Sequence, residues 1–301
     1  MKSNSIRGYA ETSAIAVGGT EGLVRLCNTG SDGILQAPPS RGIERIEARF
    51  SGQGFEPHRH DTYALGLTLS GVQTFRYRGA SRFSLPGNII ILHPDEVHDG
   101  AAGTDSGLSY RMLYLPPERL IEAADTLRSL PFVADPVISD VTFQRYLAEA
   151  LCQIETRLDD LQLDDLIGRF AEGLDRHSGQ QSRTSNRIAV KAVLLCRDFL
   201  QDNCDRVVSS GELEAICGLD RYTLARHFRC LLGTSPHRYL LMRRLDKAKA
   251  WLSKGADLAD VAVSSGFADQ AHFTRHFKKT FGMTPGHWKG LTFAASRRVA
   301  I

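Results

Sequence analysis

Long apolar runs are absent from this 301-residue sequence: no stretch approaches the ~18–20 apolar residues that a membrane-spanning helix needs. The segment from Met1 to Ala10 is polar, and the apolar region of a secretory signal does not follow it. We therefore expect a cytoplasmic protein without a membrane partner.

Paired cysteines are absent as well. The six cysteines never form a Cys-x-x-Cys pair, which argues against a zinc finger or a thioredoxin-like site. They are interpreted as buried or incidental thiols in a reducing compartment. A P-loop, a dinucleotide-binding fingerprint and a nucleophile elbow are also missing. We expect no catalytic residue, and therefore not an enzyme.

Charge is spread unevenly, although the net charge is only +3. From Arg183 to the C-terminus there are 20 Lys and Arg against 10 Asp and Glu, whereas the preceding part has 17 against 24. An acidic N-terminal part and a basic C-terminal part are typical of a protein in which one domain binds a polyanion. A basic face can also be merely solvated, so charge leaves both interpretations open. The length suggests about two domains.

Short alternating segments in the front third predict strands. Residues 43–50 place Ile46, Ala48 and Phe50 on one face. Further apolar segments follow, separated by turn signals such as Ser70-Gly71. Strands at this spacing predict a β-sandwich or barrel. The expected strands are 43–50, 63–69, 72–78, 89–92 and 108–115.

Beyond Pro116 the apolar spacing becomes helical and predicts helices over 118–127 and 139–158, the second with Ser139 as its N-cap. An apolar stripe at four- and three-residue spacing either packs on the protein's own sheet or forms a dimer interface, and it is too short to argue for a coiled coil. A stretch at 179–185, rich in Gly, Ser and Gln, indicates an interdomain linker. The stripe consists of Leu147, Leu151, Ile154, Leu158 and Leu161.

The strongest signal is a repeat with an offset of 49 residues. Each copy predicts a short helix, a glycine turn and a second helix, which is a helix-turn-helix. Residues 236–252 contain no helix breaker and predict a connecting helix of ~25 Å. Such a helix would place the two recognition helices about one DNA turn, ~34 Å, apart. The matched pairs include Leu224 with Phe273, Arg226 with Arg275, Gly233 with Gly282 and Pro236 with Pro285.

Residues 188–291 resemble the DNA-binding domain of AraC/XylS-type bacterial transcription regulators. Gly266-Phe267, the segment 273–278 and the segment 281–285 carry the resemblance. It implies a two-domain α+β protein: an N-terminal cupin-like β-barrel with dimerisation helices, and a C-terminal all-α domain with two helix-turn-helix motifs. It also implies a homodimer that binds double-stranded promoter DNA, responds to a small-molecule effector and works with RNA polymerase, usually as an activator. The expected boundaries are 1–176 for the effector and dimerisation domain, 177–187 for the linker, 188–291 for the DNA-binding domain and 292–301 for a tail.

The resemblance places DNA contacts on both recognition helices, where Arg suits guanine and Gln suits adenine. A surface or capping salt bridge is the alternative role for each arginine. Lys279 and the connecting helix, through Arg238, Arg243, Arg244, Lys247 and Lys249, are suited to phosphate contacts. The implied DNA-binding residues are Tyr222, Arg226, Arg229, Gln270, His272, Thr274, Arg275 and Lys278.

One position departs from the family pattern. Glu214 occupies a place where the first motif usually has a small Ala, whereas the second copy keeps Ala262. A glutamate cannot be buried there cheaply without a partner. Either the first motif packs differently or the Glu214 side chain reaches an edge.

The front domain resembles a cupin: Gly52, His58 and His60 match the first cupin motif, and Pro86-Gly87 and His98 echo the second. Metal cupins carry a Glu shortly after the second His, where this sequence has Ala64 and Leu65. Three histidines and an open position still make a workable zinc arrangement. Related sensor barrels generally bind an effector without metal, so we expect no cofactor and an organic-ligand pocket. Its expected lining is His58, His60, Tyr63, Arg76, His98 and Tyr110.

The expected effector depends on where the arginines point. If Arg76 or Arg111 pointed into the barrel, it would need an anion, which favours an amino acid or other carboxylate; outward, solvated arginines are the alternative. The polar loop Pro94–Gly100 is expected at the barrel mouth, near the effector. Two further functions stay open: a metal-dependent cupin enzyme fused to a DNA-binding domain, and a DNA-binding protein without an effector.

Overall fold

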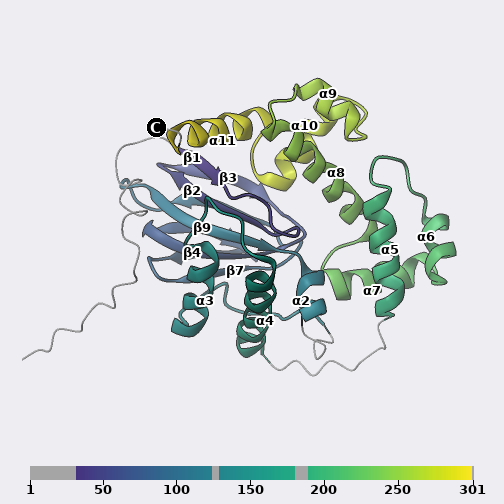
Figure 1. Ribbon diagram of the computed structural model, residues 1–301, viewed down its shortest axis with the longest axis horizontal. Coiled ribbons are helices and arrows are strands. Elements are labelled where there is room, and N and C mark those ends of the chain that lie inside the picture. Colours follow the sequence, from purple (N-terminus) through teal and green to yellow (C-terminus); the bar gives the residue numbers. More distant parts are fainter. Residues whose placement is uncertain (1–31, 124–128, 180–188, 300–301) are drawn as a thin grey trace, which may run out of the picture. The chain divides into compact units, whose positions relative to one another are not determined.

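The computed structural model describes residues 32–123, 129–179 and 189–299, and the described chain from Asp32 onward forms one compact unit (Figure 1). Strands come first, and the rest is almost entirely helical. The strands are β1 (Gly33–Gln36), β2 (Glu44–Phe50), β3 (Gln53–His58), β4 (Tyr63–Gly71), β5 (Gln73–Tyr77), β6 (Ala80–Ser84), β7 (Ile89–Leu92), β8 (His98–Ala102), β9 (Leu108–Leu115) and β10 (Val137–Ile138). The helices are α2 (Pro117–Ala123), α3 (Val141–Leu151), α4 (Asp160–His177), α5 (Val190–Asp202), α6 (Ser210–Cys217), α7 (Arg221–Leu232), α8 (Pro236–Ser253), α9 (Leu258–Ser264), α10 (Gln270–Phe281) and α11 (Pro285–Val299). We call residues 32–179 the β-rich domain and residues 189–299 the helical domain.

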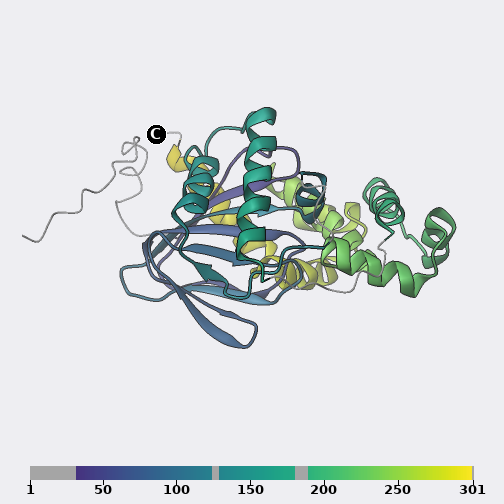
Figure 2. The ribbon, with the colours of Figure 1, turned by 90° about the horizontal axis from the view of Figure 1, so that it is seen from below.

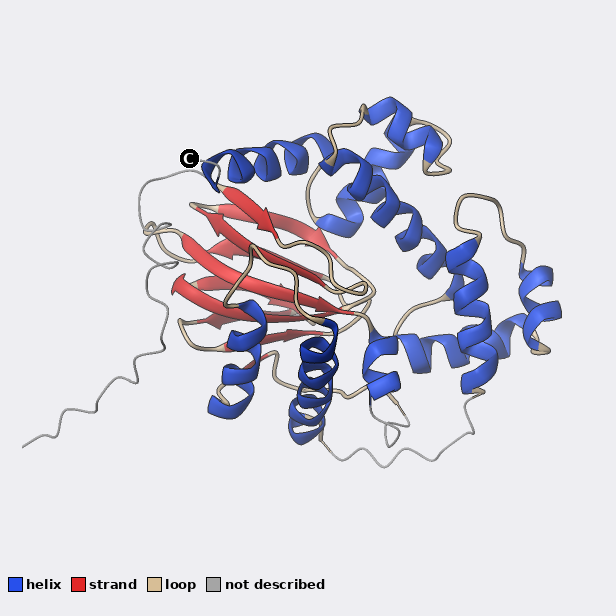
Figure 3. Ribbon diagram, in the orientation of Figure 1, coloured by secondary structure: helices blue, strands red, loops and turns tan. Residues whose placement is uncertain are grey.

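Two antiparallel sheets form the β-rich domain (Figure 3). One has the strand order β1-β2-β9-β4-β7-β10, and the other has the order β3-β8-β5-β6. Because the two sheets share no strand pairing among the described residues, the expected barrel is not closed, and the domain is a two-sheet sandwich. The expected α+β class and the five expected strands are confirmed.

One apolar cluster fills the space between the sheets and continues into the helical domain. It includes Ile46, Ala48 and Phe50 of β2, as their alternation predicts, together with Phe75 and Tyr77 of β5. Tight packing of these side chains holds the two sheets against each other.

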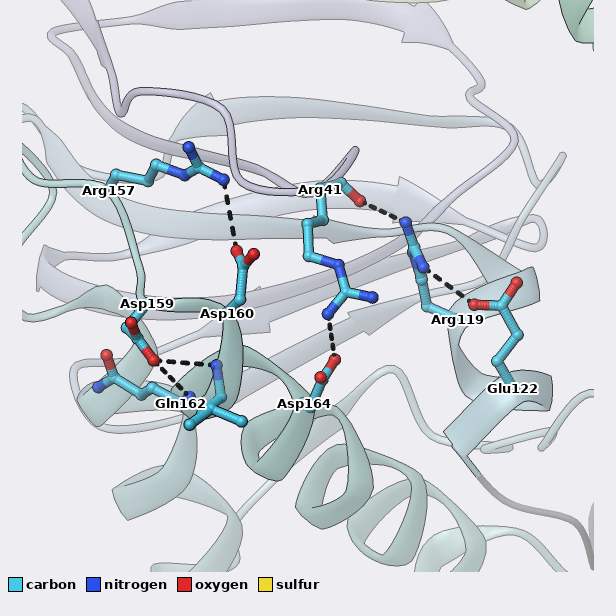
Figure 4. Close-up of polar contacts among 9 residues, drawn as sticks. Arg41, Arg119, Glu122, Arg157, Asp159, Asp160, Gln162 and Asp164 are labelled. Atoms are coloured by element: carbon cyan, nitrogen blue, oxygen red, sulfur yellow. Dashed lines mark hydrogen bonds and ion pairs between the residues drawn. The ribbon is translucent and has the colours of Figure 1, made fainter.

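The opposite face of the six-stranded sheet is covered by α3 and α4 (Figure 2). Arg45 of β2 is buried on this face, and its guanidinium donates to the carbonyls of Ala150 and Gln153. Arg41 precedes β2; it binds Asp164 of α4 at 2.6 Å, and its own carbonyl accepts from Arg119 at 3.0 Å (Figure 4). These contacts fix the helices on the sheet.

The expected helix over 139–158 is wrong in both its start and its length. Asp140, not Ser139, is the N-cap, because its carboxylate accepts from the Phe143 amide. The helix ends at Leu151, and a second N-cap, Asp159, starts α4. The other expected helix, 118–127, corresponds to α2, which begins at Pro117 and ends at Ala123; residues 124–128 lie outside the described chain.

The apolar stripe packs on the protein's own sheet. Leu147, Leu151, Ile154 and Leu158 are buried in the cluster beneath α3 and α4. Only Leu161 faces outward, with 80% of its surface exposed. The stripe therefore does not form a continuous dimer interface, because four of its five members are already used in the core.

The helical domain contains both expected helix-turn-helix motifs, α6–α7 and α9–α10. Gly218 and Gly282 end α6 and α10 in the left-handed conformation, with φ of 68° and 70°. Ser235 caps the amino end of α8, and Pro236 is its first residue. Residues 180–188 of the expected linker lie outside the described chain. The domain boundaries stay predictions.

A buried histidine makes the fold sensitive to acid. His93 accepts from the Val133 amide through Nε2 at 3.0 Å and pairs with the Tyr77 hydroxyl through Nδ1 at 2.8 Å. Burial, reinforced by the nearby Arg78 guanidinium, lowers the pKa of His93 to about 3. In the unfolded chain the pKa is about 6.5, so below that pH the unfolded state binds the proton more readily. The stability is fully present above pH 6.5 and is lost as the pH falls towards 3.

We expect His93 to contribute about 1.4 kcal/mol per pH unit to the loss of unfolding free energy between pH 5.5 and 4. Urea unfolding of the wild type and of His93→Gln at several pH values measures this. The unfolding free energy should fall less steeply with decreasing pH in the variant, by the equivalent of about one bound proton. This difference in slope does not depend on the absolute stability of the variant. Equal slopes in the two proteins would contradict the assignment.

Candidate functional site

Three buried histidines meet at one end of the sandwich. His58 of β3 lies directly across from His98 of β8 in the strand register, and their ring centroids are 4.3 Å apart. His60, just after β3, has its ring centroid 4.9 Å from that of His98. One ring nitrogen of each residue lies within 4.8 Å of the other two. We call these residues the histidine cluster.

Backbone carbonyls set the orientation of all three rings. Nδ1 of His58 lies 2.8 Å from the Glu56 carbonyl, and Nδ1 of His98 lies 2.9 Å from the Glu96 carbonyl. Nδ1 of His60 lies 2.9 Å from the Thr62 carbonyl. Because a carbonyl only accepts, each Nδ1 must carry the proton, and in a neutral imidazole the lone pair then sits on Nε2.

The cluster is neutral at pH 7. Burial lowers the pKa of His98 to about 4. Burial, together with the neighbouring rings, holds the pKa of His58 and of His60 well below the usual value. The domain therefore has uncharged imidazole nitrogens at this place, and not a positive charge that would bind an anion.

A small cavity inside the sandwich is lined by the histidine cluster and by Tyr110, which agrees with four of the six expected ligand residues. Gln73 and Met112 also line this cavity, and no pattern in the sequence had indicated them. Two buried atoms facing the cavity, Nε2 of His60 and Oε1 of Gln73, have no hydrogen-bond partner in the described chain.

The other two expected ligand residues lie elsewhere. Tyr63 belongs to the cluster under α3 and α4, and its hydroxyl donates to the Pro131 carbonyl. Arg76 is exposed on β5 and lines neither cavity. Arg111 binds Glu47 at 2.7 Å on the outer face of its sheet. Strand alternation thus turns these side chains away from the interior, and no arginine points into the sandwich in the described chain.

A larger cavity lies between the β-rich and helical domains. Ile46, Phe55 and Trp288 contribute apolar walls, and Lys249 of α8 and Glu44 of β2 contribute charge. His58 and His60 line this cavity too, so the histidine cluster borders both spaces. No local pattern in the sequence indicated this cavity, because its walls come from segments about 200 residues apart.

Five ion pairs join the two domains of the described chain. One links Arg197 of α5 to Glu122 of α2. We call the four that involve α8 and α10 the docking ion pairs. Arg243 binds Asp61 at 2.8 Å, and Lys278 binds Glu56 at 2.8 Å. The other two are Arg238 with Asp95 and Lys249 with Glu44.

In this arrangement carboxylates of the β-rich domain hold Arg238, Arg243 and Lys249. The phosphate contacts expected of these residues stay a prediction, and they require these ion pairs to open. Arg244 is also engaged within the protein, donating to the Cys204 carbonyl at 2.7 Å.

The backbone of α10 docks directly on β3. The Glu56 amide donates to the Gly282 carbonyl at 2.9 Å, and the Arg59 amide donates to the Lys279 carbonyl at 3.3 Å. A Cβ at position 282 would lie 2.7 Å from Nδ1 of His58 and 2.8 Å from the Glu56 carbonyl oxygen. Only glycine permits this approach, and it brings the end of α10 against the histidine cluster.

The expected DNA-contacting side chains are largely available. Tyr222 has 81% of its surface exposed, and Arg226, Arg229, Gln270 and Arg275 are also exposed. No ion pair or side-chain hydrogen bond engages them among the residues that the structure describes. This leaves both recognition helices with unpaired polar groups on their outer faces.

Three expected DNA contacts are partly occupied by neighbours, and one of them is Lys278, which binds Glu56. His272 packs edge-on against His276, with ring centroids 4.6 Å apart, and Thr274 is half-buried. Glu214 reaches an edge, the second of the two expected outcomes: it accepts from the Arg221 amide and guanidinium, each at 2.9 Å. The first motif therefore tolerates this residue without burying an unpaired charge.

Both domains match known protein families. Residues 41–171 match the family model of an AraC-like ligand binding domain, and residues 213–290 match that of a helix-turn-helix domain. The chain belongs to the AraC-type transcriptional regulators. It is a DNA-binding transcriptional regulator with an N-terminal ligand-binding domain, as the sequence resemblance implied.

Other regulators resemble this AraC-type chain along most of its length. The HTH-type transcriptional regulator YbfI of Bacillus subtilis is 26% identical over 243 residues, which are 79% of this chain and 88% of YbfI. The HTH-type transcriptional activator RhaS of Escherichia coli is 25% identical over 260 residues, which are 82% of this chain and 92% of RhaS.

The structure of ToxT from Vibrio cholerae superimposes with a TM-score of 0.61 at 14% identity, covering 83% of this chain and 98% of ToxT. The two proteins share the fold. None of the described helices of the regulator is long and apolar enough to cross a membrane.

Proposed function

We propose that this AraC-type regulator controls transcription through a small carboxylate effector that binds in the cavity between the domains. The docking ion pairs carry this proposal. They fix α8 and α10 on the β-rich domain, so a ligand that competes for one partner changes how the helix-turn-helix motifs are presented. Such a ligand acts by its different affinity for the docked and released states.

Lys249 is the group that an effector carboxylate would bind. Its ammonium pairs with Glu44, and it also lies 4.8 Å from the centroid of the Phe281 ring. A ligand carboxylate would take the place of Glu44, while Phe55 and Trp288 would receive the apolar part of the ligand. A solved structure of ToxT contains a bound unsaturated fatty acid, and this supports the same ligand class here.

On DNA, α7 and α10 would enter successive major grooves of a promoter. Arg226 and Arg275 would read bases, and Lys279 would bind phosphate. We further propose that the regulator acts as a homodimer in the cytoplasm, has no enzymatic activity, and recruits RNA polymerase as an activator. The relative RhaS, an activator, supports the sign of regulation.

A pair of lysine variants tests the effector site. Lys249→Ala should weaken carboxylate binding by about 10-fold or more, because a charge-assisted hydrogen bond is lost. Lys254→Ala removes an exposed lysine just beyond the same helix and should leave binding unchanged. Binding of straight-chain fatty acids of increasing length to the full chain is measured by calorimetry and by quenching of Trp288.

DNA binding is then measured with and without the tightest fatty acid. The proposal requires that the ligand shift the affinity for a selected promoter sequence in the wild type and in Lys254→Ala, but not in Lys249→Ala. Equal ligand responses in all three proteins would overturn the role of Lys249. No response in any of them would overturn the carboxylate effector.

A further inference from the structure

We propose that the histidine cluster binds one divalent transition-metal ion of the zinc class, through Nε2 of His58, His60 and His98. This site borders the effector cavity but uses the histidine nitrogens rather than Lys249, and it goes beyond the proposed function. Its occupant is recognised by nitrogen donors alone.

The donors are already close together and held by the scaffold. His58 and His98 face each other across two paired strands, which fixes their separation, and His60 closes the group from the end of β3. A metal bound to imidazole lies ~2.0–2.1 Å from each nitrogen. One ligand atom of each histidine already lies within 4.8 Å of the other two.

The second feature is the direction of the lone pairs. The three backbone carbonyls that hold Nδ1–H belong to Glu56, Glu96 and Thr62, so each ring turns Nε2 away from the backbone. Metal-binding histidines are commonly oriented in this way, because the bond at one nitrogen fixes the tautomer of the other. The scaffold therefore leaves the Nε2 lone pair of each ring available to a ligand.

The third feature is a pair of buried acceptor atoms that lack hydrogen-bond donors in the described chain. Nε2 of His60 is buried without a hydrogen-bond partner in the described chain, and so is Oε1 of Gln73 in the same cavity. A buried acceptor without a donor costs free energy, and a cation is the occupant that satisfies acceptors. Three imidazoles suit Zn²⁺ and its neighbours rather than Mg²⁺ or Ca²⁺, which prefer oxygen.

The missing acidic ligand leaves an open position rather than a broken site. Ala64 lines the same cavity in place of that ligand, and Asp99, which also lines it, accepts from the Arg76 amide at 2.6 Å. Three histidines with one open position are a stable arrangement for zinc. The open position is left to water or to a small exogenous ligand.

The site also borders the DNA-binding helices. His58 lies against Gly282, the residue that ends α10, and the Glu56 carbonyl that orients the His58 ring is next to the same glycine. Drawing His58 towards a metal would pull on the strand to which α10 is bonded. Metal occupancy should therefore alter the docking of the second helix-turn-helix motif.

The test uses the purified full-length protein, stripped of metal with a chelator and titrated with Co²⁺ and then Zn²⁺. We expect one Co²⁺ per chain, with the visible absorption of a four-coordinate nitrogen site, and its stoichiometric displacement by Zn²⁺. Zinc should also raise the melting temperature of the wild type. This spectrum does not depend on any variant being folded.

Variants then assign the ligands. His60→Ala and His98→Gln should each weaken Zn²⁺ binding by about 100-fold or more, since each removes one of three protein ligands. His287→Gln is the matched control, because His287 is an exposed histidine outside the cluster. The proposal fails if the wild type shows no four-coordinate Co²⁺ spectrum and no zinc-dependent stabilisation. It also fails if His60→Ala binds as tightly as His287→Gln. Neither result depends on whether a carboxylate effector exists.

Discussion

Replacing Arg275 by alanine is expected to weaken specific promoter binding by about 10- to 100-fold, because a bidentate arginine–guanine contact contributes about 1–3 kcal/mol of discrimination. Arg275 is exposed on α10 and makes no ion pair among the described residues, so its guanidinium is available to a base edge. Arg226 occupies the matching position on α7, and Arg226→Ala should have a similar effect at the other half of the DNA site. The measurement is a mobility-shift titration on a sequence selected from random DNA.

Two control variants distinguish a sequence-specific contact to a base from a general effect of positive charge on DNA binding. Lys279→Ala removes a side chain suited to phosphate. It should therefore weaken binding to all DNA sequences equally and reduce the dependence of that binding on salt concentration. Arg145→Ala removes an exposed arginine from α3 in the β-rich domain and should change nothing. If Arg275→Ala weakened binding to the selected sequence and to random DNA by the same factor, Arg275 would contact phosphate and not a base.

Replacing Gly282 by alanine is expected to release α10 from the β-rich domain. The position has a φ of 70°, so alanine there costs about 1 kcal/mol of backbone strain. The new Cβ would also lie 2.7 Å from His58 and 2.8 Å from a carbonyl oxygen of the backbone. The strand and the end of the helix must separate, and the two backbone bonds to Gly282 and Lys279 are lost.

Gly218 provides a matched control for the strain alone. It ends α6 with a φ of 68°, and a Cβ there would meet nothing within 4 Å. Gly218→Ala should therefore cost about 1 kcal/mol without undocking.

Hydrogen exchange is measured at the amides of Glu56 and Arg59, the two donors to α10. Exchange should be at least about 10-fold faster in Gly282→Ala and unchanged in Gly218→Ala. Equal exchange in the two variants would show that the docking does not depend on this glycine.

Local features of the sequence predicted the elements that local chemistry controls. The 49-residue repeat predicted both helix-turn-helix motifs, because glycines at helix ends and proline after a capping Ser or Thr act within a few residues. Alternation predicted the inner face of β2 for the same reason. The start of α3 was mispredicted by one residue, because Ser139 and Asp140 are both good N-caps and only the fold selects between them.

The sequence pointed to all three residues of the histidine cluster, but it did not reveal their geometry. The spacing of His58 and His60 brought these two together, and the resemblance to a cupin added His98. The sequence did not reveal that backbone carbonyls fix all three tautomers, or that Gln73 shares the cavity. These facts depend on how β3 pairs with β8, which includes register irregularities that no residue pattern predicted.

The amino-acid sequence by itself determined the two-domain plan, five of the strands and the paired helix-turn-helix motifs, because each depends on spacing within a short segment. Only the tertiary structure decided what the charged side chains do. Arg243 and Lys249 look like phosphate-binding residues along α8, yet they bind Asp61 and Glu44. An ion pair depends on which surfaces meet, and about 200 residues of chain separate these partners. The physical reason is that the partner of a long, flexible charged side chain is set by the packing of whole domains and not by its neighbours in sequence.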